Sequence, residues 1–448
     1  MERAALSFER DGTVNSLVDI FGPSLSDVLR ELSMLRETAH DKGRLESLKA
    51  DRLQRIFKLA KAEVPFYRQV LKNIESFGDT PSVLASRDDL RKRPTEYFVA
   101  DHFDSKRCLK SSTSGTSGNV FTVLNGISRF TSSVASLIRR LEHVGLSFGF
   151  RLAEIVTTDR VFLPSWDEKF NYLMGMSRTF RINLSTEELD ESLTRLHYFD
   201  PEVVWGYPSN LIRLALLLQK FNIQLSPKVL YPFGERLTEN ARRFLTKSFK
   251  APVHDSYGLM EAGLVAWQCE NLSYHIDEER VLVELMPEED GASRGVREIV
   301  LTTLTNDVMP MIRYRTGDYA IKSDTSCECG TRLVSFSRVL GRSRETFLDD
   351  NGTPVDWHPL ERYLNSFDAY AWQIMQPEPG HLHINLAGDD VDAPAVEVEI
   401  NDLFPSVRTV VAAGVVEDMQ TVIGKMPVVA GKGDEVPDDM CSCLQYRT

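Results

Sequence analysis

Hydroxyl and glycine residues crowd one short stretch of the chain. Residues 111–119 read SSTSGTSGN, after the basic residues Lys106, Arg107 and Lys110 and before VFTVL, which is typical of a strand. The backbone N–H groups and hydroxyls of such a hairpin can converge on one point, as they do in loops that hold phosphate oxygens. Asn119 stands where a Walker loop requires lysine, so that motif is excluded. A flexible polar linker is the alternative interpretation.

Three further motifs offer groups that suit a nucleotide. In DSYGLMEAG (255–263) we expect Tyr257 and the following glycine to end a strand, with the ring free to stack on a base. Glu261 should then lie at the turn, where a carboxylate can hold Mg²⁺. In YRTGDYA (314–320) we expect the strand to stop at Thr316–Gly317, which leaves Asp318 free to bind ribose hydroxyls. In GRSRETF, Arg342 is available to a phosphate or a ribose.

Cysteine and histidine gather in two segments. CENLSYH supplies Cys269 and His275, and CECG supplies Cys327 and Cys329, followed by a glycine that suits a tight thiolate turn. Three thiolates and one imidazole form a closed tetrahedral zinc set, which predicts a structural ion. Three buried free cysteines are the alternative. We assign no role to the C-x-C pair at 441–443, and six cysteines in a chain of this size predict no disulfide framework.

The order of the elements predicts a layered α/β protein. Residues 14–63 have helical periodicity, and from about 110 to 335 short apolar runs alternate with helical segments, which is typical of a largely parallel sheet. Runs between 274 and 325 indicate a small antiparallel β unit, and Asn351–Gly352 indicates a hairpin turn. We expect a large N-terminal domain (1–340, with 1–50 a helical extension) and a small, mobile α+β C-terminal domain (341–448).

Composition excludes several classes of protein. The chain has 448 residues, 26% of them charged, and a net charge of −13, which argues against nucleic acid and anionic membranes as partners. It contains no apolar run of membrane-spanning length and no signal-peptide core at its start. We therefore expect a cytoplasmic globular protein.

In their order and separation, these motifs resemble the adenylate-forming superfamily that includes acyl-coenzyme A synthetases. In detail the chain is similar to the phenylacetate–coenzyme A ligase branch, through EVPFYRQVL (63–71), SRDDLRKRP (86–94), GYPSNLIRLA (206–215) and FGERLTENAR (233–242). The resemblance covers roughly residues 50–430. Members of this branch can carry zinc near the Cys/His segments, which strengthens the prediction of that site.

The resemblance implies a set of site residues. For ATP or AMP it implies Ser111, Ser112, Thr113, Gly115, Thr116, Gly118, Gly234, Glu235, Arg236, Tyr257, Gly258, Asp318 and Arg342. For catalysis it implies Thr116, Glu261 (as the Mg²⁺ ligand) and Lys425, whose ammonium would stabilise charge near the α-phosphate, with Lys432 as the reserve. For the acid pocket we select Trp205, Tyr207, Phe233, His254 and Tyr257.

The leading hypothesis is ATP-dependent activation of a carboxylic acid to its adenylate, followed by transfer to coenzyme A. The aromatic residues near the pocket suggest an aromatic acid. Two alternatives stay open: transfer to a carrier-protein thiol or an amine, and a non-catalytic relative that binds nucleotide or acyl ligand. Ser343 and Arg344 replace the acidic hinge residue that the family usually has after its Gly-Arg motif, which favours another acceptor slightly. A homodimer is also left open.

Overall fold

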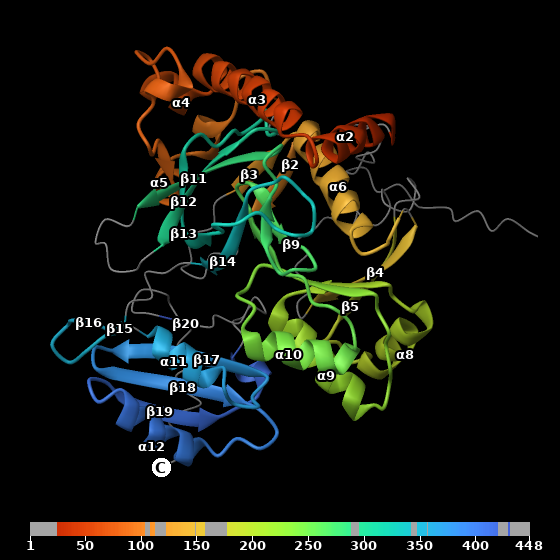
Figure 1. Cartoon of the computed structure of the whole chain (residues 1–448), viewed down its shortest axis with the longest axis vertical. Coiled ribbons are helices and arrows are strands. Elements are labelled where there is room, and N and C mark those ends of the chain that lie inside the picture. Colours follow the sequence, from red (N-terminus) through yellow and green to blue (C-terminus); the bar gives the residue numbers. More distant parts are fainter. Residues whose placement is uncertain are drawn as a thin grey trace, which may run out of the picture.

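The computed structural model describes residues 25–103, 108–112, 122–147, 149–156, 177–287, 295–341, 347–355, 357–419 and 429–430. Figure 1 shows the first helices and the strands β11–β14 at one end of the long axis, and at the other end the segment of β4, β5 and α8–α10 beside the C-terminal sheet. Within these ranges, no helix has both the length and the apolar character needed to cross a bilayer.

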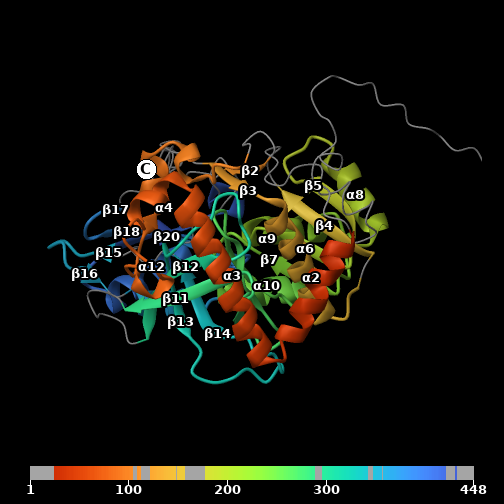
Figure 2. The ribbon, with the colours of Figure 1, turned by 90° about the horizontal axis from the view of Figure 1, so that it is seen from above.

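The N-terminal segment forms two long helices and two short ones. They are α2 (Leu25–Thr38), α3 (Lys42–Glu63), α4 (Pro65–Val70) and α5 (Arg87–Lys92). The continuous helical pattern expected here is interrupted between α2 and α3, where the side chain of Asp41 accepts a hydrogen bond from the backbone N–H of Arg44 and caps α3. Figure 2 shows α2 beside α3 and against α6 (Ile127–Glu142), on which α2 buries Leu32 and Leu35.

The predicted parallel sheet is present and has four strands. In the order β5-β4-β6-β7 it comprises Ser177–Asn183, Phe150–Val156, Val203–Gly206 and Val229–Pro232, all parallel. Three helices follow these strands along the chain: α8 (Leu189–Phe199), α9 (Pro208–Lys220) and α10 (Glu239–Phe249). They share one core with Ile155 and Leu230, whereas Leu141 of α6 packs with Val203 and Val229. The sheet is therefore covered by helices on both faces.

A larger antiparallel sheet lies beside it, as the texture of residues 274–325 predicts. Its order is β11-β12-β13-β14-β10-β9-β8, with the short β1 (Ala85–Ser86) parallel to β13. The strands are β8 (Ser256–Leu259), β9 (Gly263–Gln268), β10 (Tyr274–Ile276), β11 (Val281–Pro287), β12 (Val296–Thr303), β13 (Tyr314–Lys322) and β14 (Ser335–Gly341). Near its edge, β2 (Leu109–Ser112) and β3 (Thr122–Asn125) pair as a hairpin.

Two expected strand ends were wrong. The strand that contains Thr316 and Gly317 does not end there, because β13 continues to Lys322. Gly317, with φ of +75°, lies in a bulge against β12. Tyr257 and Gly258 lie inside β8 instead of ending a strand. A Cβ on Gly258 would lie 2.8 Å from the carbonyl oxygen of Gly263, so close pairing with β9 requires glycine here.

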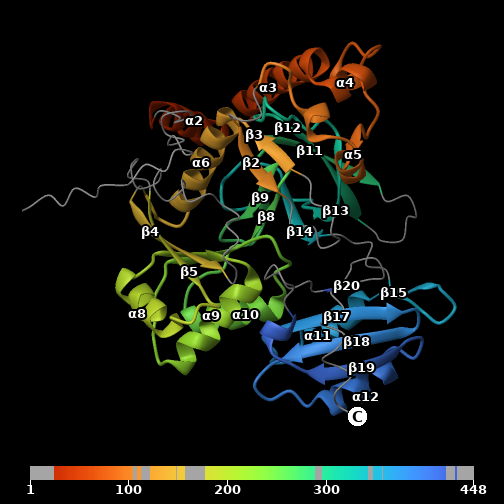
Figure 3. The same ribbon diagram turned by 180° about the vertical axis from the view of Figure 1, so that it is seen from behind.

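The C-terminal part contains the predicted hairpin and a four-stranded sheet. The hairpin pairs β15 (Phe347–Leu348) with β16 (Pro354–Val355) around Gly352, whose φ is +77°. α11 (His358–Leu364) is followed by a sheet with the strand order β19-β18-β17-β20. Along the chain, α12 (Ala393–Leu403) connects β18 to β19. These strands are Arg408–Ala413, His381–Ala387, Ala371–Glu378 and Val429–Ala430. Figure 3 shows this sheet beside α9 and α10, with which Trp372 and Ile374 share a hydrophobic core.

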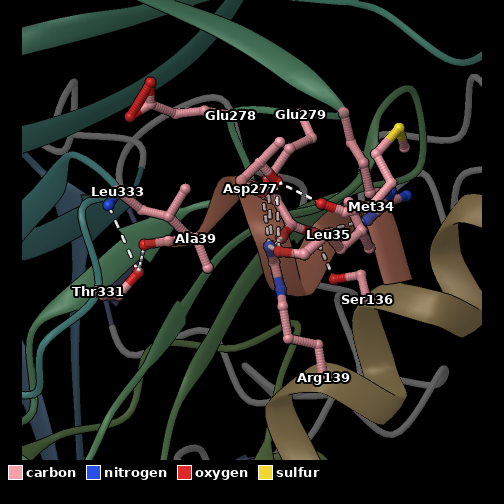
Figure 4. Close-up of polar contacts among 12 residues, drawn as sticks. Met34, Leu35, Ala39, Ser136, Arg139, Asp277, Glu278, Glu279, Thr331 and Leu333 are labelled. Atoms are coloured by element: carbon pink, nitrogen blue, oxygen red, sulfur yellow. Dashed lines mark hydrogen bonds and ion pairs between the residues drawn. The ribbon is translucent and has the colours of Figure 1, made fainter. Parts of the chain in front are cut away.

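A buried ion network joins α2, α6 and the start of β11 (Figure 4). The guanidinium of Arg139 lies 2.6 Å from Asp277 Oδ1 and 2.6 Å from Glu279 Oε1, and all three side chains are at most 3% exposed. Thr38 donates a hydrogen bond to Glu279, and the backbone carbonyl of Leu35 accepts one from Arg139. The end of α2 is thereby fixed to the antiparallel sheet through paired charges.

Candidate functional site

Glu261 lies at the turn between β8 and β9 and is 1% exposed. Its Oε1 accepts a hydrogen bond of 2.6 Å from the hydroxyl of Tyr314, and Nη2 of Arg87 lies 3.5 Å from the same oxygen. The turn itself is held by Arg129, which donates to the backbone carbonyls of Met260 and Glu261. A buried carboxylate in such a frame keeps one orientation, which is what a cation ligand needs.

Asp318 lies on β13 and is 7% exposed. Its Oδ2 accepts a hydrogen bond of 2.9 Å from the hydroxyl of Tyr257 on β8, although β8 and β13 are not neighbours in the sheet. Curvature of the sheet therefore brings the two expected nucleotide residues together. Burial raises the pKa of Asp318 to about 6, despite the hydrogen bond from Tyr257 and the charge of Arg87, which both lower it.

Sequence reasoning missed Arg87. This first residue of α5 is 22% exposed and faces Glu261 and Tyr314, and its charge also acts on Asp318. Its segment, SRDDLRKRP, has the charge pattern of a surface helix, so nothing in the spacing marks this arginine. The strand pairing of β1 with β13, Ser86 opposite Arg315, is what carries α5 to the site.

The FGER segment follows β7, and two of its side chains contact protein groups. Glu235 accepts hydrogen bonds from the backbone N–H and the hydroxyl of Ser209, at the first turn of α9. Arg236 forms an ion pair with Glu361 of α11, and its guanidinium lies 5.1 Å from the ring centre of Trp357. Gly234 adopts a φ of +75° that lets the chain turn between these contacts.

The residues selected for the acid pocket form a row of rings. The ring centres of Trp205 and Phe233 are 5.2 Å apart, and those of Phe233 and Tyr207 are 5.4 Å apart. His254 lies deeper, 6.0 Å from Tyr231, and burial lowers its pKa to about 4, so the ring is neutral at pH 7. The structure thus brings these four residues to one end of the parallel sheet.

Several selected residues lie outside the described part of the chain. Ser111 and Ser112 close β2, opposite Val123 and Thr122 of β3, so the hydroxyl-rich loop begins within a hairpin as expected. The residues beyond the described ranges are Thr113, Gly115, Thr116, Gly118, Arg342 to Glu345, Lys425, Lys432, Cys441 and Cys443.

Cys269, His275, Cys327 and Cys329 converge as predicted. Their ligand atoms all lie within 4.8 Å of one another, with 3.6 Å between the sulfurs of Cys269 and Cys327 and 3.2 Å between Cys329 Sγ and His275 Nε2. Zinc–sulfur bonds of about 2.3 Å at tetrahedral angles place two sulfurs about 3.8 Å apart, so the spacing fits that ion. His275 Nδ1 lies 3.4 Å from the carbonyl oxygen of Leu333, which leaves Nε2 to face the sulfurs.

Comparison with known proteins agrees with this geometry. No family model matches the chain. Phenylacetate-coenzyme A ligase of Thermus thermophilus is 27% identical over 387 residues, which are 81% of this chain and 82% of the relative. Phenylacetate-coenzyme A ligase of Escherichia coli is 24% identical over 80% of this chain and 83% of its own length. The chain is thus similar to phenylacetate–coenzyme A ligases over four-fifths of its length.

Solved structures confirm the fold of this ligase-like chain. A 2-hydroxyisobutyryl-CoA ligase in its postadenylation state superimposes with a TM-score of 0.71 over 92% of this chain and 94% of its own, at 17% identity. The expected fold, a large α/β part with a β unit and a small α+β C-terminal part, is therefore correct.

Proposed function

We propose that this chain activates a carboxylic acid with ATP as an acyl-adenylate and transfers the acyl group to coenzyme A. The observation that carries the proposal is the meeting of Glu261 and Asp318, two buried acids from distant motifs, around Arg87, Tyr257 and Tyr314. Relatives that bear the name of such ligases match four-fifths of the chain.

Each acid has a distinct role in this proposal. Asp318 would accept hydrogen bonds from the ribose hydroxyls, and Tyr257 orients that carboxylate through its hydroxyl. Glu261 would hold Mg²⁺, which when bound supplies positive charge to the phosphates of ATP. Lys425 and the hydroxyl-rich loop, with Thr116, would approach the same phosphates and stabilise charge as pyrophosphate leaves.

The pocket and the acceptor follow from the same proposal. Trp205, Tyr207 and Phe233 would line the acid site, and an aromatic acid fits this row of rings. We also propose that residues 341–448 form a small domain that carries Lys425 and meets the large one at α10. Asn240 and Arg243 of α10 donate hydrogen bonds to backbone carbonyls between residues 364 and 367.

We propose a structural zinc ion at the Cys/His cluster. Burial lowers the pKa of His275 to about 4, so its ring is neutral at pH 7, as a metal ligand must be. Four protein ligands leave no open coordination position, which fits a structural ion. It would tie the segment after β9 to the turn before β14, two strands that lie on either side of β10 in the antiparallel sheet.

Pyrophosphate release tests the function. Purified protein would receive ATP, Mg²⁺ and a panel of aryl and aliphatic acids, with and without coenzyme A, beside Asp318→Ala and Lys425→Ala variants. We expect acid-dependent release that turns over repeatedly only with coenzyme A and is lost in both variants. A single equivalent of pyrophosphate, unchanged by coenzyme A, would show that the acceptor is a different thiol or an amine. ATP binding without release from any acid would contradict the catalytic assignment.

A further inference from the structure

Three side chains with nitrogen donors lie around the ring of Tyr231 in β7. The guanidinium carbon of Arg140 lies 5.7 Å from the ring centre, and the ring of His254 lies 6.0 Å from it. Trp205 is the register partner of Tyr231 across β6 and β7, so its side chain lies on the same face of the sheet. Tyr231, Arg140 and His254 are buried, whereas Trp205 is half-buried.

Arg140 differs sharply from its neighbour Arg139. Arg139 is paired with Asp277 and Glu279, as Figure 4 shows. Arg140 is 6% exposed, yet its guanidinium forms no ion pair within the described ranges. Its Nη1 lies 3.2 Å from the hydroxyl oxygen of Ser256, and its Nε, like that of Arg139, has no hydrogen-bond partner in the part of the chain that the structure describes. A buried cation without a carboxylate is costly, because nothing replaces the water that it has lost.

The pKa directions of the two arginines agree with this contrast. Burial lowers the pKa of both guanidinium groups. At Arg139 the charges of Glu279 and Asp277 outweigh burial, and the pKa rises. At Arg140 the charge of Asp277 acts only from a distance and those of Arg139 and Arg280 oppose it, so the pKa stays lowered. Among the described residues, Arg140 therefore has no counter-ion of the kind that its neighbour has.

The two other side chains around Tyr231 also offer hydrogen-bonding groups. Nε1 of Trp205 is buried and has no partner. The ring of His254 is 5% exposed and neutral, so it offers one donor and one acceptor. Buried polar groups in native proteins are nearly always satisfied, so two such atoms together, Arg140 Nε and Trp205 Nε1, indicate an acceptor that the described residues do not supply.

This group lies at the inner end of the proposed acid pocket. Trp205 contacts Phe233, and Phe233 contacts Tyr207, so the row of rings leads from the carboxyl ends of β6 and β7 inward to Tyr231. On the other side, Ser256, which contacts Arg140, directly precedes Tyr257 of the nucleotide site. An acid whose reacting carboxylate lies near Glu261 and Asp318 would thus point its far end at Arg140.

We propose that the acid substrate carries a second carboxylate, bound by Arg140 and assisted by Trp205 and His254. This inference rests on the proposed acid-activating function and names the substrate class for the same pocket. Arg140 acts as a specificity residue, because a monocarboxylic acid would leave its charge buried and unpaired. The second carboxylate would supply acceptor oxygens for the unsatisfied donors of Arg140 and Trp205.

Binding calorimetry in the presence of AMP tests the inference without requiring turnover. The probes are two matched pairs, terephthalate with 4-methylbenzoate and adipate with hexanoate. Arg140→Met removes the charge, and Arg140→Lys retains it. Arg36→Met is the control, because Arg36 of α2 forms an exposed ion pair with Glu142, which lies on α6 as Arg140 does. In wild type and in Arg36→Met, at least one dicarboxylate should bind roughly tenfold more tightly than its monoacid partner. Arg140→Met should abolish this preference, and Arg140→Lys should retain part of it.

The opposite results would overturn the inference. Equal binding of both members of each pair, or a preference that survives in a folded Arg140→Met protein, would show that the group around Tyr231 is satisfied by water. ATP–pyrophosphate exchange with the same acids separates the two proposals. Dicarboxylate binding that depends on Arg140 without any exchange would refute the proposed activity and leave the inference standing. If monoacids support exchange and Arg140→Met does not change it, the proposed activity stands and the inference about a second carboxylate is refuted.

Discussion

Replacing Arg139 with methionine should destabilise the protein strongly, because it leaves two buried carboxylates without their shared cation. Asp277 and Glu279 are 0% exposed. Asp277 would keep Arg280 at 3.0 Å, but Glu279 would keep only neutral donors such as Thr38. Removing one partner of a buried ion pair costs about 3–5 kcal/mol. With an unfolding entropy of about 2.1 cal/mol/K per residue, a unit of roughly 340 residues should lose roughly 4–7 °C in Tm.

Differential scanning calorimetry measures this loss, with Arg36→Met as the matched control. Arg36 pairs with Glu142, but the two side chains are 50% and 30% exposed, so that variant should cost about 0–1 kcal/mol. Glu279→Gln should lower the free energy of unfolding less in the Arg139→Met background than in the wild type. In that background Glu279 has already lost its ion pair with Arg139, so neutralising it removes no further attraction. A Tm for Arg139→Met within about 1 °C of the control would refute the reasoning, because it would show that the carboxylates are not held by this arginine.

Three other predictions concern the site. Because burial raises the pKa of Asp318 to about 6, AMP affinity should fall roughly tenfold between pH 7 and pH 5, and Asp318→Asn should flatten the profile; a flat wild-type titration would contradict the role of this carboxylate. The sign for folding is the opposite: the folded pKa lies above the ordinary value of 3.8, so protonation of Asp318 stabilises the fold below about pH 4, and this contribution is lost as pH rises through 6. Cys329→Ser should reduce zinc content, measured by atomic absorption, from one equivalent toward zero and lower the Tm, whereas wild-type protein purified without zinc would rule the site out. Glu361→Gln should cost about 1.5–3 kcal/mol at the contact with Arg236 and increase the radius of gyration in solution scattering; unchanged scattering would show that the C-terminal part is held elsewhere.

Local signals in the sequence were sufficient wherever a turn or a chelate determines the structure. Asn351–Gly352 predicts its hairpin because few residues adopt the required positive φ. The segments with Cys269 and His275 and with Cys327 and Cys329 predict a cluster, because this spacing of thiolates and imidazole is typical of metal ligands. The end of α3 at Glu63 also has a local cause, since Pro65 has no backbone N–H with which to continue that helix.

The remaining features depend on contacts between distant segments. Arg87, Arg139 and Arg140 all have the local pattern of solvent-exposed helix residues, yet tertiary packing buries each to a different degree. The bulge at Gly317 is defined by the register between β13 and β12, so the sequence around Gly317 alone does not predict it. Which acids meet which arginines is set by the curvature of the sheet, and a single sequence does not encode that curvature in any local window.

The attachment of α2 also has a consequence for the order of folding. Its last residues are fixed by partners far along the chain: Glu279 binds Thr38, and the backbone N–H of Arg332 donates to the carbonyl of Ala39 at 2.7 Å. During synthesis, roughly three hundred residues must therefore emerge before α2 can form all its final contacts. Its apolar residues stay exposed until α6 has been synthesised. α2 is therefore synthesised early but reaches these contacts only after the segment around Arg332 has emerged.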